Sequence, residues 1–170
     1  GMGRSGTTHL QYLFWQDPRF GFVTNYQANL HPVALIGRGW LKSRIAAGMP
    51  ETRPMDNVAV TLDAPQEEEL ALVNITEHAA FHFASFPREL PSIYDRYVTE
   101  LGSDADELAR WQSAYLEVLK KATLLSGGKP LVLKTPTHTG RVGVLNSMFP
   151  EAKYVYIVRN PYRVNQSMRN

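Results

Sequence analysis

The stretch Gly3-Arg-Ser-Gly-Thr-Thr8 is a glycine-rich turn that runs straight into an expected helix at residues 7–14. Such a turn directs backbone N–H groups and the positive end of the helix toward an anion. Its glycines allow close approach to the backbone, its hydroxyls add donors, and its arginine adds fixed charge. The same residue types also begin many helices that bind nothing. The sequence therefore predicts an anion-binding loop with the candidate binding residues Arg4, Ser5, Gly6, Thr7 and Thr8.

The loop differs from the P-loop of ATPases and GTPases at one position. The spacing Gly1-x4-Gly6-Thr7-Thr8 overlays the pattern G-x-x-x-x-G-K-[ST], but Thr7 stands where that pattern requires lysine. An ordinary ATPase or GTPase is therefore not predicted.

A second segment, Lys153-Tyr-Val-Tyr-Ile-Val158, consists of β-branched and aromatic residues with little polar alternation. This composition is typical of a strand covered on both faces. Arg159 follows it, and Pro161 then suits the first turn of a helix over 161–169 that carries Ser167. In open parallel sheets, ligands bind beyond the carboxyl ends of the strands, so we expect Arg159 beside a ligand phosphate.

Taken together, these segments resemble the sulfotransferase family, which uses 3′-phosphoadenosine 5′-phosphosulfate (PAPS) as donor. The loop at residues 4–8 resembles that family's 5′-phosphosulfate loop. Arg159 and Ser167, eight positions apart, resemble the arginine and serine that hold the 3′-phosphate. The resemblance therefore implies PAPS as co-substrate, with Arg4 in both a binding and a catalytic role.

A third match lies between the two segments. Residues 130–138 read as a buried strand that ends in a polar turn, and they resemble the family's strand with its Leu-Lys-Thr ending. The lysine of that ending often contacts the transferring sulfonate, which implies this role for Lys134. The clear resemblance covers residues 1–20 and 130–170 and is greatest to the bacterial and glycan-type branch, with a weaker match from Arg53 to Glu69.

The strands and the resemblance together imply an α/β fold. It is expected to be a P-loop-like three-layer fold with a central parallel β-sheet flanked by helices. Strands 130–134 and 153–158 are expected to be parallel, joined by a right-handed crossover through a helix around 139–148. We expect a single sulfotransferase-like domain over 1–170, incomplete at both ends, because an anion-binding turn normally follows a strand and later nucleotide-contacting segments are missing.

The expected chemistry is sulfonate transfer to an acceptor hydroxyl or amine by in-line displacement, by analogy with phosphoryl transfer. Arg4 and Lys134 would stabilise the charge that develops on the bridging and sulfonate oxygens. A general base should accept the acceptor's proton.

The sequence leaves the identity of that base open. Cytosolic members of the family have a histidine directly after Lys-Thr; here Pro136 takes that place, and the nearest histidine is His138. His138 is the first candidate because an imidazole pKa near ~6.5 suits proton transfer, although it also fits a helix cap or a partner of another site residue. Glu67 and Glu69 are the rival candidates, but three acidic residues at a helix start are also typical of a solvated end.

Composition limits the possible partners. With 44% hydrophobic residues and no apolar run near the ~20 residues of a membrane span, the chain is expected to be a globular, cytoplasmic protein. It has no cysteine, and its five histidines show no zinc-site spacing, so no metal is predicted.

Charge is distributed unevenly along the chain. Residues 1–60 carry six basic and three acidic residues, residues 61–110 carry three basic and eleven acidic, and residues 111–170 carry nine basic and two acidic. The basic outer thirds suit a polyanionic donor, whereas singly placed basic residues do not predict nucleic-acid binding.

Two other function classes stay open: a P-loop-type phosphotransferase with a degenerate loop, and a nucleotide-binding module without catalysis. The phosphotransferase would need Mg²⁺ and a carboxylate at a strand end, where the sequence has Arg159 instead. The acceptor could be a small molecule, a glycan or a lipid, and the oligomeric state is undetermined. Aromatic and histidine side chains that could line an acceptor pocket are Tyr26, His31, Trp40, Phe81 and Phe83.

Local signals also predict the other helices. Ser103-Asp-Ala-Asp106 resembles a capping box and opens the clearest helix, which Gly127-Gly128 ends. Residues 66–75 and, loosely, 26–48 read as helix, whereas residues 48–65 read as a proline-containing connector and 76–100 as irregular.

Overall fold

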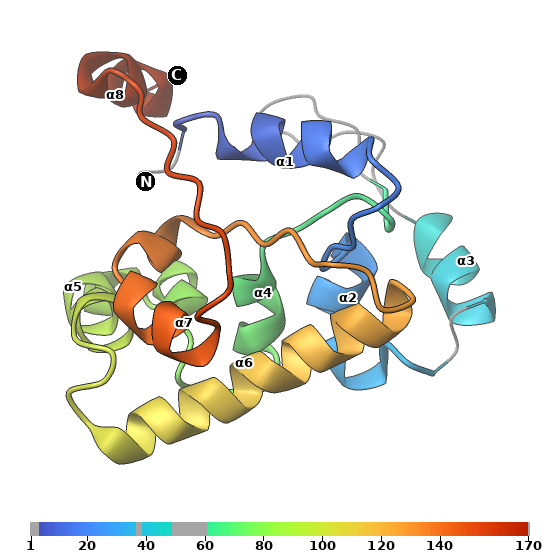
Figure 1. The fold of residues 1–170 in the computed structure, drawn as a ribbon, viewed down its shortest axis with the longest axis horizontal. Helices are drawn as coiled ribbons and strands as arrows, with labels where there is room; N and C mark the ends of the chain where they lie inside the picture. The colour runs from blue at the N-terminus through green and yellow to red at the C-terminus, as the bar shows by residue number, and fades with distance from the viewer. Residues whose placement is uncertain (1–3, 37–38, 49–60, 170) are drawn as a thin grey trace.

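The computed structural model describes residues 4–36, 39–48 and 61–169. Its regular structure is helical (Figure 1): α1 Thr7–Trp15, α2 Asn25–Asn29, α3 Trp40–Ala46, α4 Glu68–Val73, α5 Leu90–Tyr94, α6 Ala105–Leu125, α7 Val142–Met148 and α8 Pro161–Arg169. Short turns η1–η5 connect these helices at His31–Val33, Ala80–Ala84, Pro87–Glu89, Asp95–Thr99 and Pro136–Thr139. Most of the predicted connector, including residues 53–60 of the weaker family match, lies outside the described residues.

Helix α6 is the longest element of the described chain and forms one wall of the core. The Asp104 side chain caps it by accepting hydrogen bonds from two backbone N–H groups of its first turn, at 2.9 and 3.0 Å. Gly127 and Gly128 follow it with φ of 73° and 80°, a conformation that glycine adopts without steric cost. The predicted helix is therefore confirmed, with its cap at Asp104. Its buried residues are Trp111, Tyr115, Val118, Leu119 and Ala122.

The main core lies where α6 packs against α4, and α2 also packs against α4. Leu72 on α4 and Val23 before α2 are almost fully buried in this cluster. The predicted helix at 26–48 is divided into α2, η1 and α3, while the predicted helix at 66–75 forms as the shorter α4.

The predicted central sheet is not confirmed. Within the described ranges the structure has no extended strand pairing, only two isolated bridges: Gly21 with Leu131, parallel, and Thr24 with Pro65, antiparallel. The first is held by Gly21 N–H to the Pro130 carbonyl at 2.8 Å and Val132 N–H to the Gly21 carbonyl at 2.9 Å. A side chain at Gly21 would come within 2.6 Å of Ser126, so only glycine permits this approach.

The segment predicted as a covered strand, residues 153–158, lies outside regular structure and is largely exposed. Val155 is 70% exposed and Val158 81%. Its residues favour β-structure, but a strand also needs a partner backbone. No described segment pairs with it. The predicted crossover helix between the two strand segments does form, as α7.

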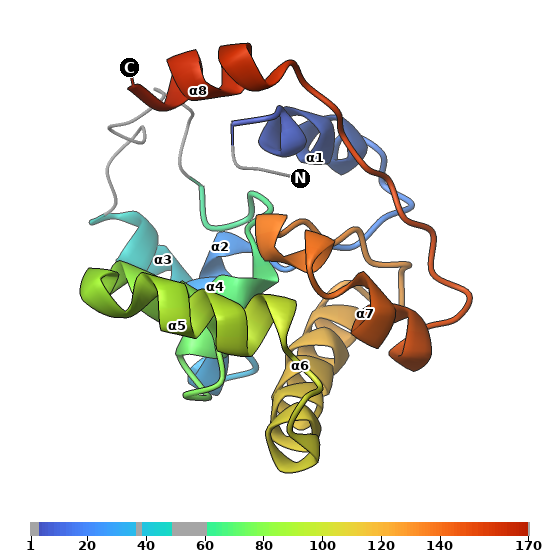
Figure 2. The same ribbon diagram turned by 90° about the vertical axis from the view of Figure 1, so that its left-hand side faces the viewer.

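Helices α1 and α8, from opposite ends of the chain, lie together on the side of the molecule away from α6 (Figures 1 and 2). The described helices include none that is both long enough and apolar enough to cross a bilayer.

Candidate functional site

Three predicted donor-binding residues from the two ends of the chain lie in contact. Arg4 Nε donates to the Ser167 carbonyl oxygen at 3.1 Å and to Ser167 Oγ at 3.2 Å. Arg159 donates from a terminal guanidinium nitrogen to the Arg4 carbonyl oxygen at 2.7 Å. Sequence separations of 163 and 155 positions are bridged by these contacts. We call Arg4, Arg159 and Ser167 the terminal cluster.

The loop beside this cluster has an unusual backbone. Gly6, the N-cap of α1, has φ 99°, and Arg4 has φ 61°. A non-glycine residue in this region costs on the order of 1–2 kcal/mol, so the surroundings must hold Arg4 in place. The first turn of α1 has no acidic residue, and no side chain caps it. Its positive end is thus not compensated by an acidic side chain of its own first turn.

The predicted hydroxyl donors differ in their environment. Ser5 is buried, and its Oγ has no hydrogen-bond partner within the described part of the chain. Thr7 and Thr8 lie in the first turn of α1 and are partly buried. A buried hydroxyl without a partner costs free energy, so an oxygen-rich ligand at this loop would stabilise it.

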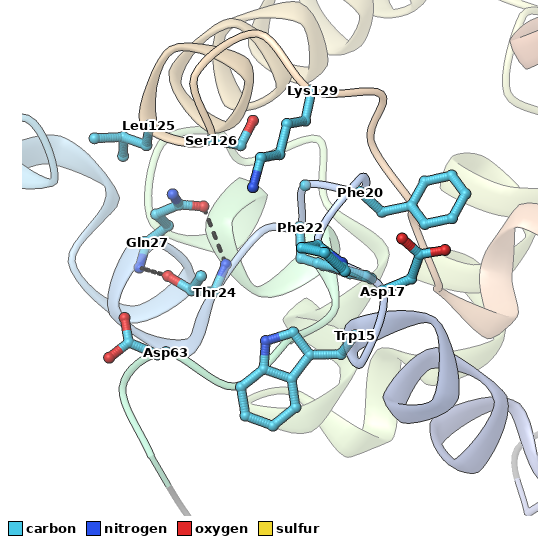
Figure 3. A pocket seen from close by; sticks show the side chains of 12 residues that line it. Trp15, Asp17, Phe20, Phe22, Thr24, Gln27, Asp63, Leu125, Ser126 and Lys129 are labelled. Carbon is cyan, nitrogen blue, oxygen red and sulfur yellow. Dashed lines mark hydrogen bonds between the residues drawn. The ribbon is translucent and has the colours of Figure 1, made fainter.

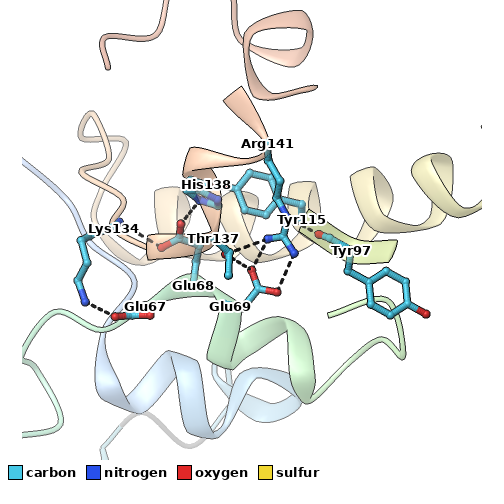
Figure 4. A network of polar contacts seen from close by, with 9 residues as sticks. All are labelled: Glu67, Glu68, Glu69, Tyr97, Tyr115, Lys134, Thr137, His138 and Arg141. Carbon is cyan, nitrogen blue, oxygen red and sulfur yellow. Dashed lines mark hydrogen bonds and ion pairs between the residues drawn. The ribbon is translucent and has the colours of Figure 1, made fainter. Parts of the chain in front are cut away.

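A second set of candidates meets between α4 and the segment that leads into α7 (Figure 4). Three consecutive glutamates each pair with a different basic side chain of that segment. We call this arrangement the glutamate ladder and its pairs the outer, middle and inner pairs, which are Glu67–Lys134, Glu68–His138 and Glu69–Arg141.

The inner pair is completely buried. Glu69 and Arg141 are both 0% exposed. Arg141 Nε also donates to the Tyr97 carbonyl at 2.6 Å, and its guanidinium lies 5.0 Å from the Trp111 ring centre. Glu69 accepts the Ala80 N–H at 2.6 Å. The pair therefore joins α4, α6, α7, η2 and η4 at one point.

The middle pair contains a buried carboxylate with several partners. His138 Nε2 contacts Glu68 Oε1 and lies 3.1 Å from the Tyr115 hydroxyl. The backbone N–H of Lys134 donates to Glu68 Oε2 at 3.3 Å. Burial alone would raise the pKa of Glu68, but His138 and the backbone donors more than offset it, so the net pKa lies below the usual value. Burial raises the pKa of Tyr115 well above its usual value, which keeps the phenol neutral.

The outer pair contains the partly exposed glutamate of the ladder. The side chains of Glu67 and Lys134 are 17% and 12% exposed. Burial raises the pKa of Glu67; Lys134 opposes this shift, while the charges of Glu68 and Glu69 reinforce it. A carboxylate with a raised pKa, in contact with solvent, is a stronger base than an ordinary glutamate.

The family profile described as Sulfotransferase family matches residues 1–170, the whole chain. The chain belongs to the sulfotransferase family. Its fold class is thus that of a P-loop-like α/β family, although the sheet itself is not formed among the described residues.

Named relatives support the same family. The omega-hydroxy-beta-dihydromenaquinone-9 sulfotransferases Stf3 of Mycobacterium bovis (strain ATCC BAA-935 / AF2122/97) and Mycobacterium tuberculosis (strain CDC 1551 / Oshkosh) are each 30% identical to this chain. Each alignment spans 167 residues, 98% of this chain and 42% of the relative. The chain thus spans less than half the length of these relatives. No solved structure matches it.

For this sulfotransferase chain, one prediction was that the three glutamates form a solvated helix start. That prediction is wrong. Glu68 and Glu69 are 0% exposed. The sequence analysis did not propose Glu68, Tyr115 or Arg141 as site residues. A signal was present: the basic side chains Lys134, His138 and Arg141 have the spacing of one helical face, and three consecutive carboxylates occur elsewhere in the chain.

The residues named for an acceptor pocket do not gather around one cavity. Tyr26 and His31 are buried in the interior, whereas Trp40 is 67% exposed. Phe81 and Phe83 pack edge to face with ring centres 5.4 Å apart. An open pocket of about 260 Å³ lies elsewhere, at the C-terminal end of α1, and its lining includes Trp15, Phe20, Phe22 and Lys129 (Figure 3).

Among the residues that the structure describes, no three His, Cys, Asp or Glu side chains are grouped so as to hold a metal ion.

Proposed function

We propose that this chain forms the donor-binding and transfer site of an enzyme that moves a sulfonate group from PAPS to an acceptor hydroxyl. The observation that carries the proposal is the terminal cluster. Two guanidinium groups and a serine hydroxyl, predicted independently from opposite ends of the sequence, meet beside the N-terminus of α1.

Residues from one end of the chain would bind the donor's 5′-phosphosulfate, and residues from the other end would bind its 3′-phosphate. The loop at residues 4–8 would hold the 5′-phosphosulfate through Arg4, the backbone and the hydroxyls of Ser5, Thr7 and Thr8. Arg159 and Ser167 would hold the 3′-phosphate. The excess of basic residues in both outer thirds of the chain raises the local concentration of such a polyanion.

Transfer would form a bond between the acceptor oxygen and sulfur while the bond from sulfur to the bridging phosphate oxygen breaks. Adenosine 3′,5′-bisphosphate leaves. Lys134 would neutralise charge on the sulfonate and bridging oxygens, with Arg4 acting on the same charge from the loop. In the structure the ammonium group of Lys134 is paired with Glu67, so the two charges neutralise each other in the absence of an anionic ligand.

The acceptor's proton would pass to Glu67. This carboxylate combines a raised pKa with partial exposure, and it touches the lysine proposed to act on the sulfonate. His138 stays an alternative base, but its Nε2 faces Glu68 and Tyr115, and its Nδ1 is buried without a partner among the described residues. An acceptor hydroxyl would therefore reach Glu67 more readily.

For the acceptor we propose a lipid alcohol. The support is the printed name of the relatives, sulfotransferases of an omega-hydroxy dihydromenaquinone, at 30% identity. Glycan, other small-molecule and amine acceptors are the alternatives.

The direct test supplies ³⁵S-labelled PAPS with a long-chain alcohol, a monosaccharide or an alkylamine and measures labelled product. Label in the alcohol, absent from an Arg4→Ala variant, supports the proposal. Binding of adenosine 3′,5′-bisphosphate without transfer to any acceptor would instead identify a nucleotide-binding module.

A further inference from the structure

Both the side-chain ammonium group and the backbone N–H of Lys134 contact glutamates that are neighbours in sequence. Glu67 pairs with its ammonium group, and Glu68 Oε2 accepts its backbone N–H at 3.3 Å (Figure 4). The two carboxylates are consecutive in sequence at the start of α4. Moving the main chain of Lys134 therefore moves its ammonium group relative to Glu67.

In the described part of the chain, no sheet ladder fixes this stretch of backbone. Lys134 lies outside regular structure, and the nearest bridge is at Leu131. Within the described residues, the Lys134 N–H donates to the Glu68 carboxylate. A backbone N–H that donates to an ionised carboxylate makes a charge-assisted hydrogen bond, which is stronger than a neutral one of the same length.

Glu68 is itself fully buried and has several partners. It is 0% exposed, its other oxygen contacts His138 Nε2, and the Tyr115 hydroxyl lies 3.1 Å from the same nitrogen. The adjacent Glu69 is fixed by Arg141. The start of α4 is thus tied to the segment 134–141 at several points, which makes it a rigid reference for Lys134.

We propose that Glu68 is a positioning residue, which fixes the main chain of Lys134 so that its ammonium group meets Glu67. The inference rests on the proposed function, in which Lys134 and Glu67 act on the transferring sulfonate and the acceptor proton. Glu68 touches neither donor nor acceptor and acts only through Lys134.

The test follows the titration of the Glu67 carboxyl by ¹³C NMR in variants at position 68, with the signal assigned by its loss in Glu67→Gln. Two charges compete at Glu67: Glu68 raises its pKa and Lys134 lowers it. Glu68→Gln removes the charge but keeps an oxygen that accepts the Lys134 N–H. Glu68→Leu removes the charge and the acceptor at similar volume. Glu107→Gln, which removes a partly buried carboxylate paired with Arg96, is the matched control.

Both variants at position 68 lose the same negative charge, so their difference isolates the position of Lys134. The Glu67 pKa is expected to fall in Glu68→Gln and to be higher in Glu68→Leu than in Glu68→Gln, because the lysine is no longer held against Glu67. Equal Glu67 pKa values in the two variants would overturn the proposal. Glu107→Gln should leave the Glu67 titration as it is in the unmodified chain.

If Glu68→Leu does not fold, as judged by its amide spectrum, Glu68→Asp takes its place. It keeps the charge but withdraws the carboxylate by about 1.5 Å, one carbon–carbon bond. The Glu67 pKa should then rise above that of the unmodified chain, and an unchanged pKa would overturn the proposal.

The titration needs no transfer activity, so its outcome is separate from that of the proposed function. Adenosine 3′,5′-bisphosphate should bind Glu68→Leu as tightly as the unmodified chain, since Glu68 is not in the terminal cluster. Failure of the unmodified chain to bind the bisphosphate would refute the proposed function but leave the positioning result standing.

Discussion

At the scale of single residues, Lys134 and Arg4 are expected to differ in what they contribute. Lys134→Ala should lower the transfer rate about 10²–10³-fold with little change in donor affinity, because it acts on charge that develops in the transition state. Arg4→Ala should lower both, since its loop also binds the ground state. Single-turnover rates together with donor titrations measure the two effects separately. A lysine variant that loses affinity and rate equally would contradict this division.

The pH dependence of transfer identifies the base. Burial raises the Glu67 pKa, so the acidic limb of the pH–rate profile should lie above the ordinary glutamate value of about 4.3. The rate rises with pH through this limb as the carboxyl loses its proton. Glu67→Gln should abolish the limb and lower the rate about 10²–10⁴-fold. A limb that survives in Glu67→Gln and disappears in His138→Ala would make the histidine the base.

At the scale of structural elements, the inner pair of the ladder is expected to dominate stability. Arg141→Met leaves Glu69 buried without its cation and should lower the free energy of unfolding by about 3–5 kcal/mol. The double variant Arg141→Met with Glu69→Leu should recover most of that loss, because no uncompensated charge remains. Urea denaturation measures both, and a double variant no more stable than Arg141→Met would show that the pair contributes more than mutual neutralisation.

The middle pair gives stability a pH dependence of known sign. Glu68 has a folded-state pKa below its unfolded value, so its contribution is fully present above the unfolded pKa of about 4.3 and is lost as pH falls through the folded pKa. Below about pH 4 the unmodified chain should therefore lose stability more steeply than Glu68→Gln. Thermal melts between pH 3 and pH 6 compare the slopes; parallel curves would contradict the shift.

The elements also show what sequence could predict. Helices α1, α6, α7 and α8 form where local signals placed them, because caps, glycines and prolines act within a few residues. The sheet and the ladder depend on segments far apart in the chain. Residues 153–158 have a strand's composition but no partner backbone among the described residues. The partners of the buried Glu68 are the His138 ring, 70 positions away, and the Lys134 backbone N–H, 66 positions away. That Arg4 and Ser167 belong to one donor site could be predicted because each carries its own motif, but their direct contact was not predicted.

At the scale of the whole molecule, the central claim is that the two ends of the chain form one site for a nucleotide with phosphate at both its 3′ and 5′ positions. The contacts of Arg4 with Ser167 and of Arg159 with Arg4 join those ends. Calorimetric titration of the unmodified chain, Arg159→Ala and Ser167→Ala with adenosine 3′,5′-bisphosphate and adenosine 5′-phosphate tests this claim most directly. Arg163→Ala is the control, because Arg163 lies on α8 with Ser167 but outside the terminal cluster.

Each substitution removes a charge-assisted contact worth ~1.5–3 kcal/mol. Arg159→Ala and Ser167→Ala should therefore weaken bisphosphate binding roughly ten- to a hundredfold, leave monophosphate binding nearly unchanged, and contrast with an unaffected Arg163→Ala. Equal losses for the two nucleotides would contradict the assignment of Arg159 and Ser167 to the 3′-phosphate, and with it the single two-ended site.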